Sequence, residues 1–287
     1  MSLTKYYYQF TRTDLYPVQF DSHGIPHVYL PDVGHICHPI TIANWGLHLY
    51  NCYIESHNES TLDRAINLTS WLIKNHKEGI WFINFPNNFY KINPPWPSAM
   101  VQGQAIGLLS RIGALLKRKD CLKIATLALK PFSKSVTEGG VLVKTKYGDF
   151  YEEYPSTPPS LVLNGFIFSL FGLHDLGNLH NIETAKQLYL NGLNCLKNII
   201  DQYDTGFWTR YDLYPIKRHA SQEYHKLHIS LLKSLLSIVN EPRFTFTAKR
   251  WQKYRNSIGC QMRWLINKLN EKLLYTEYIS TLKLRIK

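Results

Sequence analysis

The sequence predicts an all-α fold, an α/α-barrel (toroid) of about four helical hairpins that carries a small β-hairpin insertion. Apolar residues recur at helical spacing in about eight segments, and these fall into consecutive pairs of roughly 40 to 50 residues each. No Gly/Ser-rich linker separates the pairs, so we expect a single α/α-barrel domain over residues 41–287. Residues 1–40, rich in Tyr, Pro, Gly and His, are expected to form an irregular segment packed on that core.

The first predicted helices follow from spacing and capping signals. Ile42, Trp45, Leu49 and Tyr53 lie on one face of a helix over 39–56. A second helix over 60–76 is expected to take Ser60 as its N-cap, and a third over 96–119 begins with proline and ends in a basic turn. The remaining predicted helices cover 120–132 (stopped by Pro131), 160–177, 182–203, 219–239 and 246–272.

A β-hairpin is predicted over residues 138–153, where the side chains alternate, with its turn at Gly148-Asp149. Because neighbouring side chains in a strand face opposite ways, we expect only one of Glu152 and Glu153 to point into a cleft and the other to be a surface carboxylate. Thr157 or Ser160 is expected to cap the helix that follows.

Composition limits the class of protein. With 45% hydrophobic and 19% charged residues, a chain of 287 residues can bury a sizeable core. No run of about 18 apolar residues is present, so no transmembrane helix is expected. The N-terminus lacks the basic and apolar parts of a signal peptide, and the five scattered cysteines form no CxxC pair. We therefore expect a cytoplasmic protein with buried thiols.

The formal net charge of +12 favours an anionic partner, which leaves nucleic acid, acidic lipid and acidic polysaccharide open. Lysines and arginines are spread along the chain, and no nucleic-acid-binding motif is visible, so no nucleic-acid partner is expected. No GxGxxG, P-loop or GxSxG motif is present, which argues against nucleotide cofactors and serine hydrolases.

Two further segments carry polar residues in apolar surroundings. Gln102 and Gln104 lie near the start of a predicted helix, where ligand binding and buried amide packing both remain open. Ser221 is expected to cap a helix whose first turn holds Tyr224, with His228 on the same face, and such a helix start suits an anion. His225 and His228 lack an HExxH pattern and a third ligand, so no metal is expected.

Four motifs in order resemble the C-terminal catalytic domain of the heparosan D-glucuronyl C5-epimerase family. They are "PITIANWGLHLY", "PPWPSAMVQGQA", "YEEYPSTPPSLVLNGFIFSLFGLHDL" and "YDTGFWTRYDL" followed by "YHKLHI", within roughly residues 17–240. The resemblance implies an α/α-barrel that inverts C5 of a uronic acid residue (glucuronate to iduronate) within an acidic polysaccharide. It also implies that no cofactor takes part.

The resemblance places the catalytic group on Glu153, Tyr154, Tyr211 and Tyr224. We interpret Glu153 and Tyr224 as an acid–base pair on opposite faces of the sugar ring. Tyr154 and Tyr211 would then bind the substrate carboxylate or assist proton transfer. Substrate binding is assigned to Gln102, Gln104, Asn164, Arg210, Arg218, His225 and His228.

Two departures from the family bear on the substrate. The N-terminal β-rich region of the animal enzymes is not expected here, and Tyr214 stands where the family often has arginine, so Arg210 or Arg218 would supply that cation. A polysaccharide lyase and a non-catalytic uronan-binding module remain alternatives, and a homodimer is left open. A glycoside hydrolase is disfavoured, because adjacent glutamates do not straddle a glycosidic bond.

Overall fold

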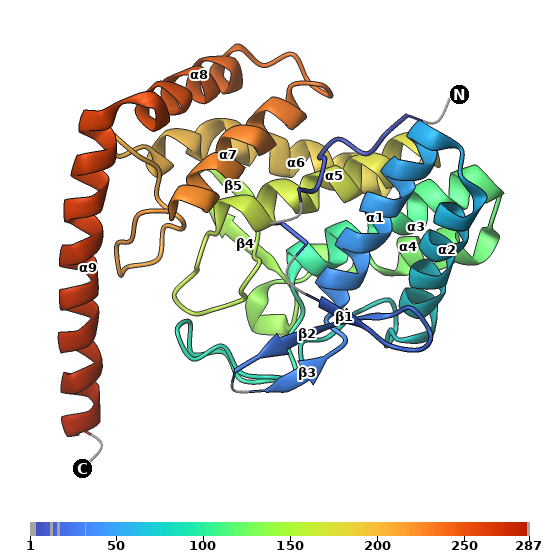
Figure 1. Cartoon of the computed structure of the whole chain (residues 1–287), viewed down its shortest axis with the longest axis horizontal. Helices are drawn as coiled ribbons and strands as arrows, with labels where there is room; N and C mark the ends of the chain where they lie inside the picture. The colour runs from blue at the N-terminus through green and yellow to red at the C-terminus, as the bar shows by residue number, and fades with distance from the viewer. Residues whose placement is uncertain (1–3, 12–13, 16–17, 32, 286–287) are drawn as a thin grey trace. The chain divides into compact units, whose positions relative to one another are not determined.

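The computed structural model describes residues 4–11, 14–15, 18–31 and 33–285, with side chains up to residue 272 (Figure 1). It is mostly helical, with two small antiparallel sheets. The chain divides into two compact units, residues 1–198 and residues 199–287, called here the first and second units. The expectation of one domain over residues 41–287 stays a prediction.

The first unit contains three consecutive helical hairpins, as the sequence predicts (Figure 1). They are α1 (Pro39–Ser56) with α2 (Glu59–Lys74), α3 (Ala99–Leu116) with α4 (Lys119–Leu127), and α5 (Leu163–Leu179) with α6 (Glu183–Ile199). The bounds of α1 are those predicted from the sequence.

Helices α3 and α5 form the interior of the first unit, because nearly every residue from Ala99 to Gly113 and from Leu163 to Gly177 is buried. A helix that is apolar on all sides needs neighbours on all sides. Among the described residues, α3 is long and apolar enough to cross a membrane by composition, but 78% of it is buried inside the protein. Its apolar character therefore reflects a core position.

The two core helices cross at residues without bulky side chains. A Cβ atom on Gly103 would collide with the backbone of Ser169, and one on Gly172 would collide with the carbonyl oxygen of Gly103. The helix axes can approach this closely only because these positions carry no side chain.

Several helix boundaries differ from the sequence prediction. The N-cap of α2 is Asn58, which accepts from the N–H of Thr61, so the predicted cap Ser60 lies inside the helix. Val162 precedes α5, which leaves neither Thr157 nor Ser160 as its cap. Helix α4 ends at Leu127, before Pro131, and a 3₁₀ helix η1 (Lys130–Ser133) follows.

Part of the predicted irregular N-terminal segment is a sheet. Strands β1 (Val18–Phe20), β2 (Pro26–Leu30) and β3 (Gly34–Ile36) form an antiparallel meander in that order. Strands of three to five residues are too short for alternation to stand out in a sequence. Residues 1–3, 12–13, 16–17 and 32 of this segment lie outside the described residues.

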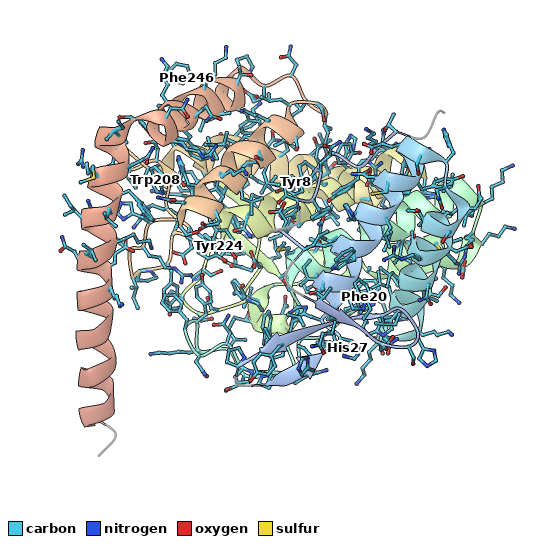
Figure 2. All side chains as sticks on the ribbon, viewed as in Figure 1. Tyr8, Phe20, His27, Trp208, Tyr224 and Phe246 are labelled. Carbon is cyan, nitrogen blue, oxygen red and sulfur yellow. The ribbon has the colours of Figure 1, made fainter. Side chains whose placement is uncertain are left out.

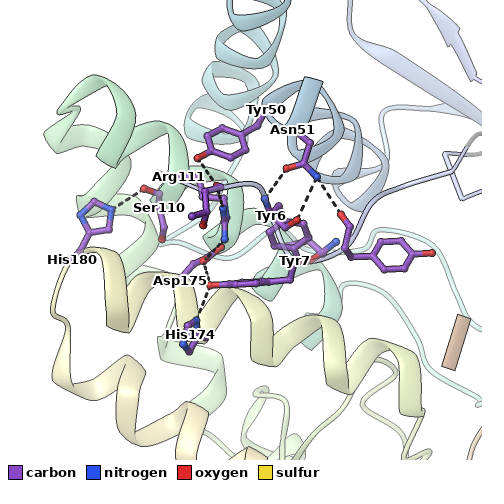
Figure 3. Close-up of polar contacts among 12 residues, drawn as sticks. Tyr6, Tyr7, Tyr50, Asn51, Ser110, Arg111, His174, Asp175 and His180 are labelled. Atoms are coloured by element: carbon purple, nitrogen blue, oxygen red, sulfur yellow. Dashed lines mark hydrogen bonds and ion pairs between the residues drawn. The ribbon is translucent and has the colours of Figure 1, made fainter. Parts of the chain in front are cut away.

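A buried polar network holds residues 4–8 against the core helices (Figure 3). The Arg111 guanidinium on α3 donates twice to the Asp175 carboxylate on α5, at 2.7 and 2.8 Å, and once to the carbonyl of Thr4. Tyr7 donates to Asp175 at 2.6 Å, and its ring lies 4.7 Å from the Arg111 guanidinium. The buried charges are thus paired and hydrogen-bonded, as burial requires.

The predicted β-hairpin is present as β4 (Leu142–Thr145) and β5 (Gly148–Tyr151). Its turn is wrong by two residues, because Gly148 pairs with Thr145 across the ladder. Lys146 and Tyr147 form the two-residue connection, and Gly148 begins β5 with a φ of 125°.

The second unit contains the 3₁₀ helix η3 (Ile200–Tyr203) and helices α7 (Gln222–Leu235), α8 (Pro242–Asn256) and α9 (Ile258–Arg285). Ser221 caps α7 as predicted and accepts from the N–H of Tyr224. The single helix predicted over 246–272 is two helices that meet at Ser257, which has an extended backbone. Phe246, on α8, is exposed (Figure 2).

Candidate active site

Glu152 and Glu153 directly follow β5, and both are buried. The expectation of one surface carboxylate is wrong, because the strand ends at Tyr151 and the alternation of side chains ends with it. The backbone of Glu152 is tied on both sides: its N–H donates to the carbonyl of Val141, and its carbonyl accepts from the N–H of Ala99 at the start of α3.

The Glu152 carboxyl group binds the turn that precedes α5. It accepts a very short hydrogen bond from the Ser160 hydroxyl and another, at 3.1 Å, from the N–H of Leu161. Burial raises the pKa of Glu152 to about 8, although the donors from Ser160 and Leu161 oppose that shift. Both oxygens of this carboxyl group therefore accept hydrogen bonds inside the protein.

Glu153 lies against the first turn of α5. The side-chain amide of Asn164 donates to its carboxylate at 3.2 Å, and a Cβ atom on Gly165 would collide with that carboxylate. A helix start favours a negative charge because of the helix dipole and its free N–H groups. The Oδ1 atom of Asn164 is buried without a hydrogen-bond partner among the described residues.

Tyr154 is half-buried in an aromatic cluster. Its ring stacks on Tyr90 with centroids 4.8 Å apart, and Trp96 lies at 5.8 Å. Both neighbours come from the segment between α2 and α3, and both are almost fully buried. The cluster fixes the ring of Tyr154 by packing.

Gln102 and Gln104 are buried amides. Gln102 accepts from the N–H of Trp81 and donates to the carbonyls of Gly79 and Ala128. Gln104 donates to Asn44 and accepts a very short hydrogen bond from Tyr6. These contacts favour buried amide packing, and their assignment to substrate binding stays a prediction without a supporting contact.

In the second unit, Tyr211 and Tyr224 come together. Their ring centroids lie 4.7 Å apart, edge to face, and Tyr224 is in the first turn of α7 as predicted. Figure 2 labels Tyr224 on this helix. The phenols are thus held by ring packing at the positive end of a helix.

Arg218 also contacts Tyr211. Its guanidinium lies 4.7 Å from the Tyr211 ring and donates to the buried Asp212 carboxylate at 2.6 and 2.8 Å. Arg210 is half-exposed, and its side chain makes no hydrogen bond or ion pair with any described residue. Of the two candidate cations, Arg210 is therefore the one that is not committed to a protein carboxylate.

His225 and His228 belong to the core of the second unit. Nε2 of His225 bonds the carbonyl of Trp251 at 3.2 Å, and Nδ1 of each imidazole bonds the Thr209 hydroxyl, at 2.9 and 3.2 Å. Burial lowers the pKa of His225 to about 4 and that of His228 to about 3. Both are neutral and fully buried, so no contact supports their assignment to substrate binding.

The two groups of predicted catalytic residues lie in different units. Glu153, Tyr154 and Asn164 come from the first unit, and Tyr211, Arg218 and Tyr224 come from the second. That the groups face one substrate stays a prediction. Within the described part of the chain, no three His, Cys, Asp or Glu side chains are grouped as metal ligands would be.

Comparison with known proteins identifies the family. The model of the D-glucuronyl C5-epimerase C-terminus matches residues 74–253. The chain belongs to this family. Its relatives include the D-glucuronyl C5-epimerase of Caenorhabditis elegans, with 36% identity over 210 residues, or 64% of this chain and 33% of that protein. The uncharacterized protein MJ1128 of Methanocaldococcus jannaschii is 28% identical over 211 residues, or 68% of each chain.

Solved structures with a similar fold belong to several enzymes. Cellobiose 2-epimerase from Bacillus thermoamylovorans has a TM-score of 0.54 at 10% identity and covers 82% of this chain and 65% of that chain. Unsaturated glucuronyl hydrolase from Bacillus sp. GL1 has a TM-score of 0.53 at 15% identity, with 76% and 62% covered. At such low identity these likenesses concern the fold alone, and they confirm the predicted α/α-barrel class for this member of the C5-epimerase family. The chain spans about a third of the C. elegans relative.

Several residues around the predicted site of this C5-epimerase family member were not predicted from the sequence. Ser160 and Leu161 bind Glu152, Tyr90 and Trp96 hold Tyr154, and Asp212 holds Arg218. The signal for Asp212 was its place between Tyr211 and Arg218. For Tyr90 and Trp96 no local signal exists, since they meet Tyr154 only in the folded chain.

Proposed function

We propose that the protein inverts C5 of a uronic acid residue, converting glucuronate to iduronate, within an acidic polysaccharide. The observation that carries this proposal is the buried Glu153 carboxylate beside Asn164 at the start of α5, followed by Tyr154, in a chain of the C5-epimerase family. The chain matches only part of its C. elegans relative. The epimerase activity of that whole protein is therefore a proposal for this chain.

The chemistry requires a base and an acid on opposite faces of one sugar ring. The C5 hydrogen lies next to a carboxylate, so its removal gives an enolate-like dianion that must be stabilised by nearby donors or cations. A base takes the C5 proton from one face, and an acid returns a proton to the other face. No bond between sugars breaks, and the only net change is the configuration at C5.

Residues of both units have the required chemistry. Glu153 and Tyr224 are our acid–base pair, and Tyr154 and Tyr211 would bind the carboxylate or assist proton transfer. Arg210 supplies a cation for a substrate carboxylate, since Arg218 is already paired with Asp212. The net charge of +12 suits a polyanionic substrate. A homodimer and a cytoplasmic location stay predictions.

Deuterium uptake at C5 of heparosan in heavy water tests the proposal. We expect uptake without chain cleavage, and loss of uptake in Glu153→Gln, which keeps the size of the side chain but removes its charge. Unsaturated chain ends would instead establish a lyase, and binding without uptake would establish a module. Heparosan binding should weaken with salt, because exposed charges are screened within about 10 Å at 0.1 M. Equal affinity for a neutral glucan would contradict the role of charge.

A further inference from the structure

The two consecutive glutamates differ in what they contact. Glu153 lies against the start of α5, whereas Glu152 accepts hydrogen bonds from the Ser160 hydroxyl and the Leu161 N–H and, through its backbone, bonds Val141 and Ala99. It is fully buried, and it takes no part in the proposed chemistry. Its position directly before Glu153 needs an explanation.

The turn that Glu152 binds is strained. Leu161 has a φ of 51°, in the left-handed region that a leucine rarely adopts. Such a residue is energetically disfavoured and persists only where its surroundings hold it. The hydrogen bond from the Leu161 N–H to the Glu152 carboxyl group is one such restraint, and Ser160 adds a second.

This turn sets where α5 begins. Val162 follows Leu161 and takes the N-cap position of α5, and its side chain makes no capping hydrogen bond that would fix the first turn. The next residues of the helix, Asn164 and Gly165, are those that contact the Glu153 carboxylate. A shift of the turn would therefore move the amide and the bare backbone against which Glu153 lies.

We propose that Glu152 is a positioning residue: by binding Ser160 and Leu161 it holds the left-handed turn that places the start of α5 against Glu153. The neighbouring glutamate then keeps a fixed position next to Asn164. The same residue joins this turn to α3, because its carbonyl accepts the N–H of Ala99. The activity readout of this inference rests on the proposed function.

The test separates hydrogen bonding from mere bulk. Glu152→Met keeps the length of the side chain but removes the acceptor, whereas Glu152→Gln keeps one acceptor oxygen for the Leu161 N–H. With heparosan in heavy water, we expect Met to lower kcat about 10-fold or more with little change in KM, since misplacement of about 1 Å can cost 10²-fold. Gln should retain most of kcat. Equal effects of Met and Gln would overturn the proposal.

A second substitution tests the link through the turn. Leu161→Gly removes the left-handed strain, because glycine adopts positive φ readily. In the Glu152→Met background it should restore much of kcat, and failure to restore any would overturn the proposal. Glu138→Met is the matched control: Glu138 also accepts from a serine hydroxyl and a backbone N–H, but on the surface of the 3₁₀ helix η2 (Val136–Glu138). It should leave kcat unchanged.

A measurement without substrate keeps the inference testable if the proposed function fails. The side-chain amide of Asn164, assigned in the NMR spectrum by Asn164→Asp, reports its contact with Glu153. Its resonance should move in Glu152→Met and return in the double variant with Leu161→Gly. No movement in Glu152→Met would overturn the positioning role, whether or not heparosan is turned over.

Discussion

Two pairs of side chains are held by different means: Glu152 and Glu153 in the first unit, called here the carboxylate group, and Tyr211 and Tyr224 in the second unit, called here the phenol group. Glu152 and Glu153 are buried and fixed by hydrogen bonds to the chain that begins α5. Tyr211 and Tyr224 are half-buried and fixed by contact between their rings and by the Arg218 guanidinium. The comparison shows that hydrogen-bond donors locate the two carboxyl groups, whereas ring contacts locate the two phenols.

The largest expected effect comes from the phenol group. Tyr224→Phe keeps the ring and its contact with Tyr211, so the free energy of unfolding should hardly change. Loss of a positioned acid or base typically lowers the rate about 10²–10⁴-fold. Deuterium uptake at C5 of heparosan should therefore nearly vanish while binding persists.

Tyr211→Phe is the parallel variant. We favour Tyr224 because the positive end of α7 stabilises a phenolate there. The Arg218 guanidinium 4.7 Å from the Tyr211 ring offers a competing source of positive charge. Near-normal uptake in Tyr224→Phe, with loss in Tyr211→Phe, would reverse the two roles.

The carboxylate group should respond to pH through Glu152. Its pKa rises from 4.5 to about 8 on folding, so its contribution to stability is fully present below pH 4.5 and is lost as pH rises through about 8. Glu152→Gln does not titrate. Between pH 4.5 and about 8, the free energy of unfolding of the native protein should fall by about 1.4 kcal/mol per pH unit relative to that of Glu152→Gln.

Urea unfolding across this pH range measures the difference in slope. Glu153 is the charged neighbour that also raises the pKa of Glu152, so in Glu153→Gln the decline should end at a slightly lower pH, with the slope unchanged. Glu138→Gln, at an exposed carboxylate, is the control. Parallel slopes for native protein and Glu152→Gln would show that Glu152 ionises normally.

In the second unit, the buried His228 should make stability depend on pH in the opposite direction. The pKa of His228 falls from 6.5 to about 3 on folding, so its contribution to stability is present above pH 6.5 and is lost as pH falls. His228→Leu should lower the free energy of unfolding by a constant amount and make its decline below pH 6.5 less steep. Urea unfolding at several acid pH values measures this decline. If His228 were protonated in the native state, the native protein and the variant would show the same decline.

The smallest expected effect concerns the two arginines. Arg210→Gln should raise KM about 10-fold and weaken the salt dependence of binding, because a charge-assisted hydrogen bond is worth about 1.5–3 kcal/mol. Arg218→Gln should lower kcat instead, since it withdraws support from Tyr211. Equal effects of both variants on KM would place both arginines on the substrate.

Sequence alone predicted the helical hairpins because their apolar periodicity is long and regular. Helix α1 was predicted residue for residue, helped by Pro39 in its first turn. Three-residue strands and the cap at Asn58 were missed, since so short a pattern does not stand out and several residues near a helix start can serve as caps.

The predicted site was harder to derive than the fold. The expectation that either Glu152 or Glu153 is a surface carboxylate failed because strand alternation was extended two residues beyond Tyr151, where β5 ends. The cap at Ser221 was correct because its side chain and its helix are adjacent in sequence. Partners such as Tyr90 for Tyr154 depend on long-range packing, which a local pattern does not encode.

The crossing at Gly103 and Gly172 limits how this protein can be engineered. Replacing helical glycine by alanine is a common route to thermostability, since it reduces the freedom of the unfolded chain. Here the added methyl group would push α3 and α5 apart. Ala99, one turn before Gly103, binds Glu152, and Asn164, two turns before Gly172, binds Glu153. Because Gly103 and Gly172 carry no side chain, α3 and α5 keep the close spacing of the helix starts that hold the neighbouring glutamates.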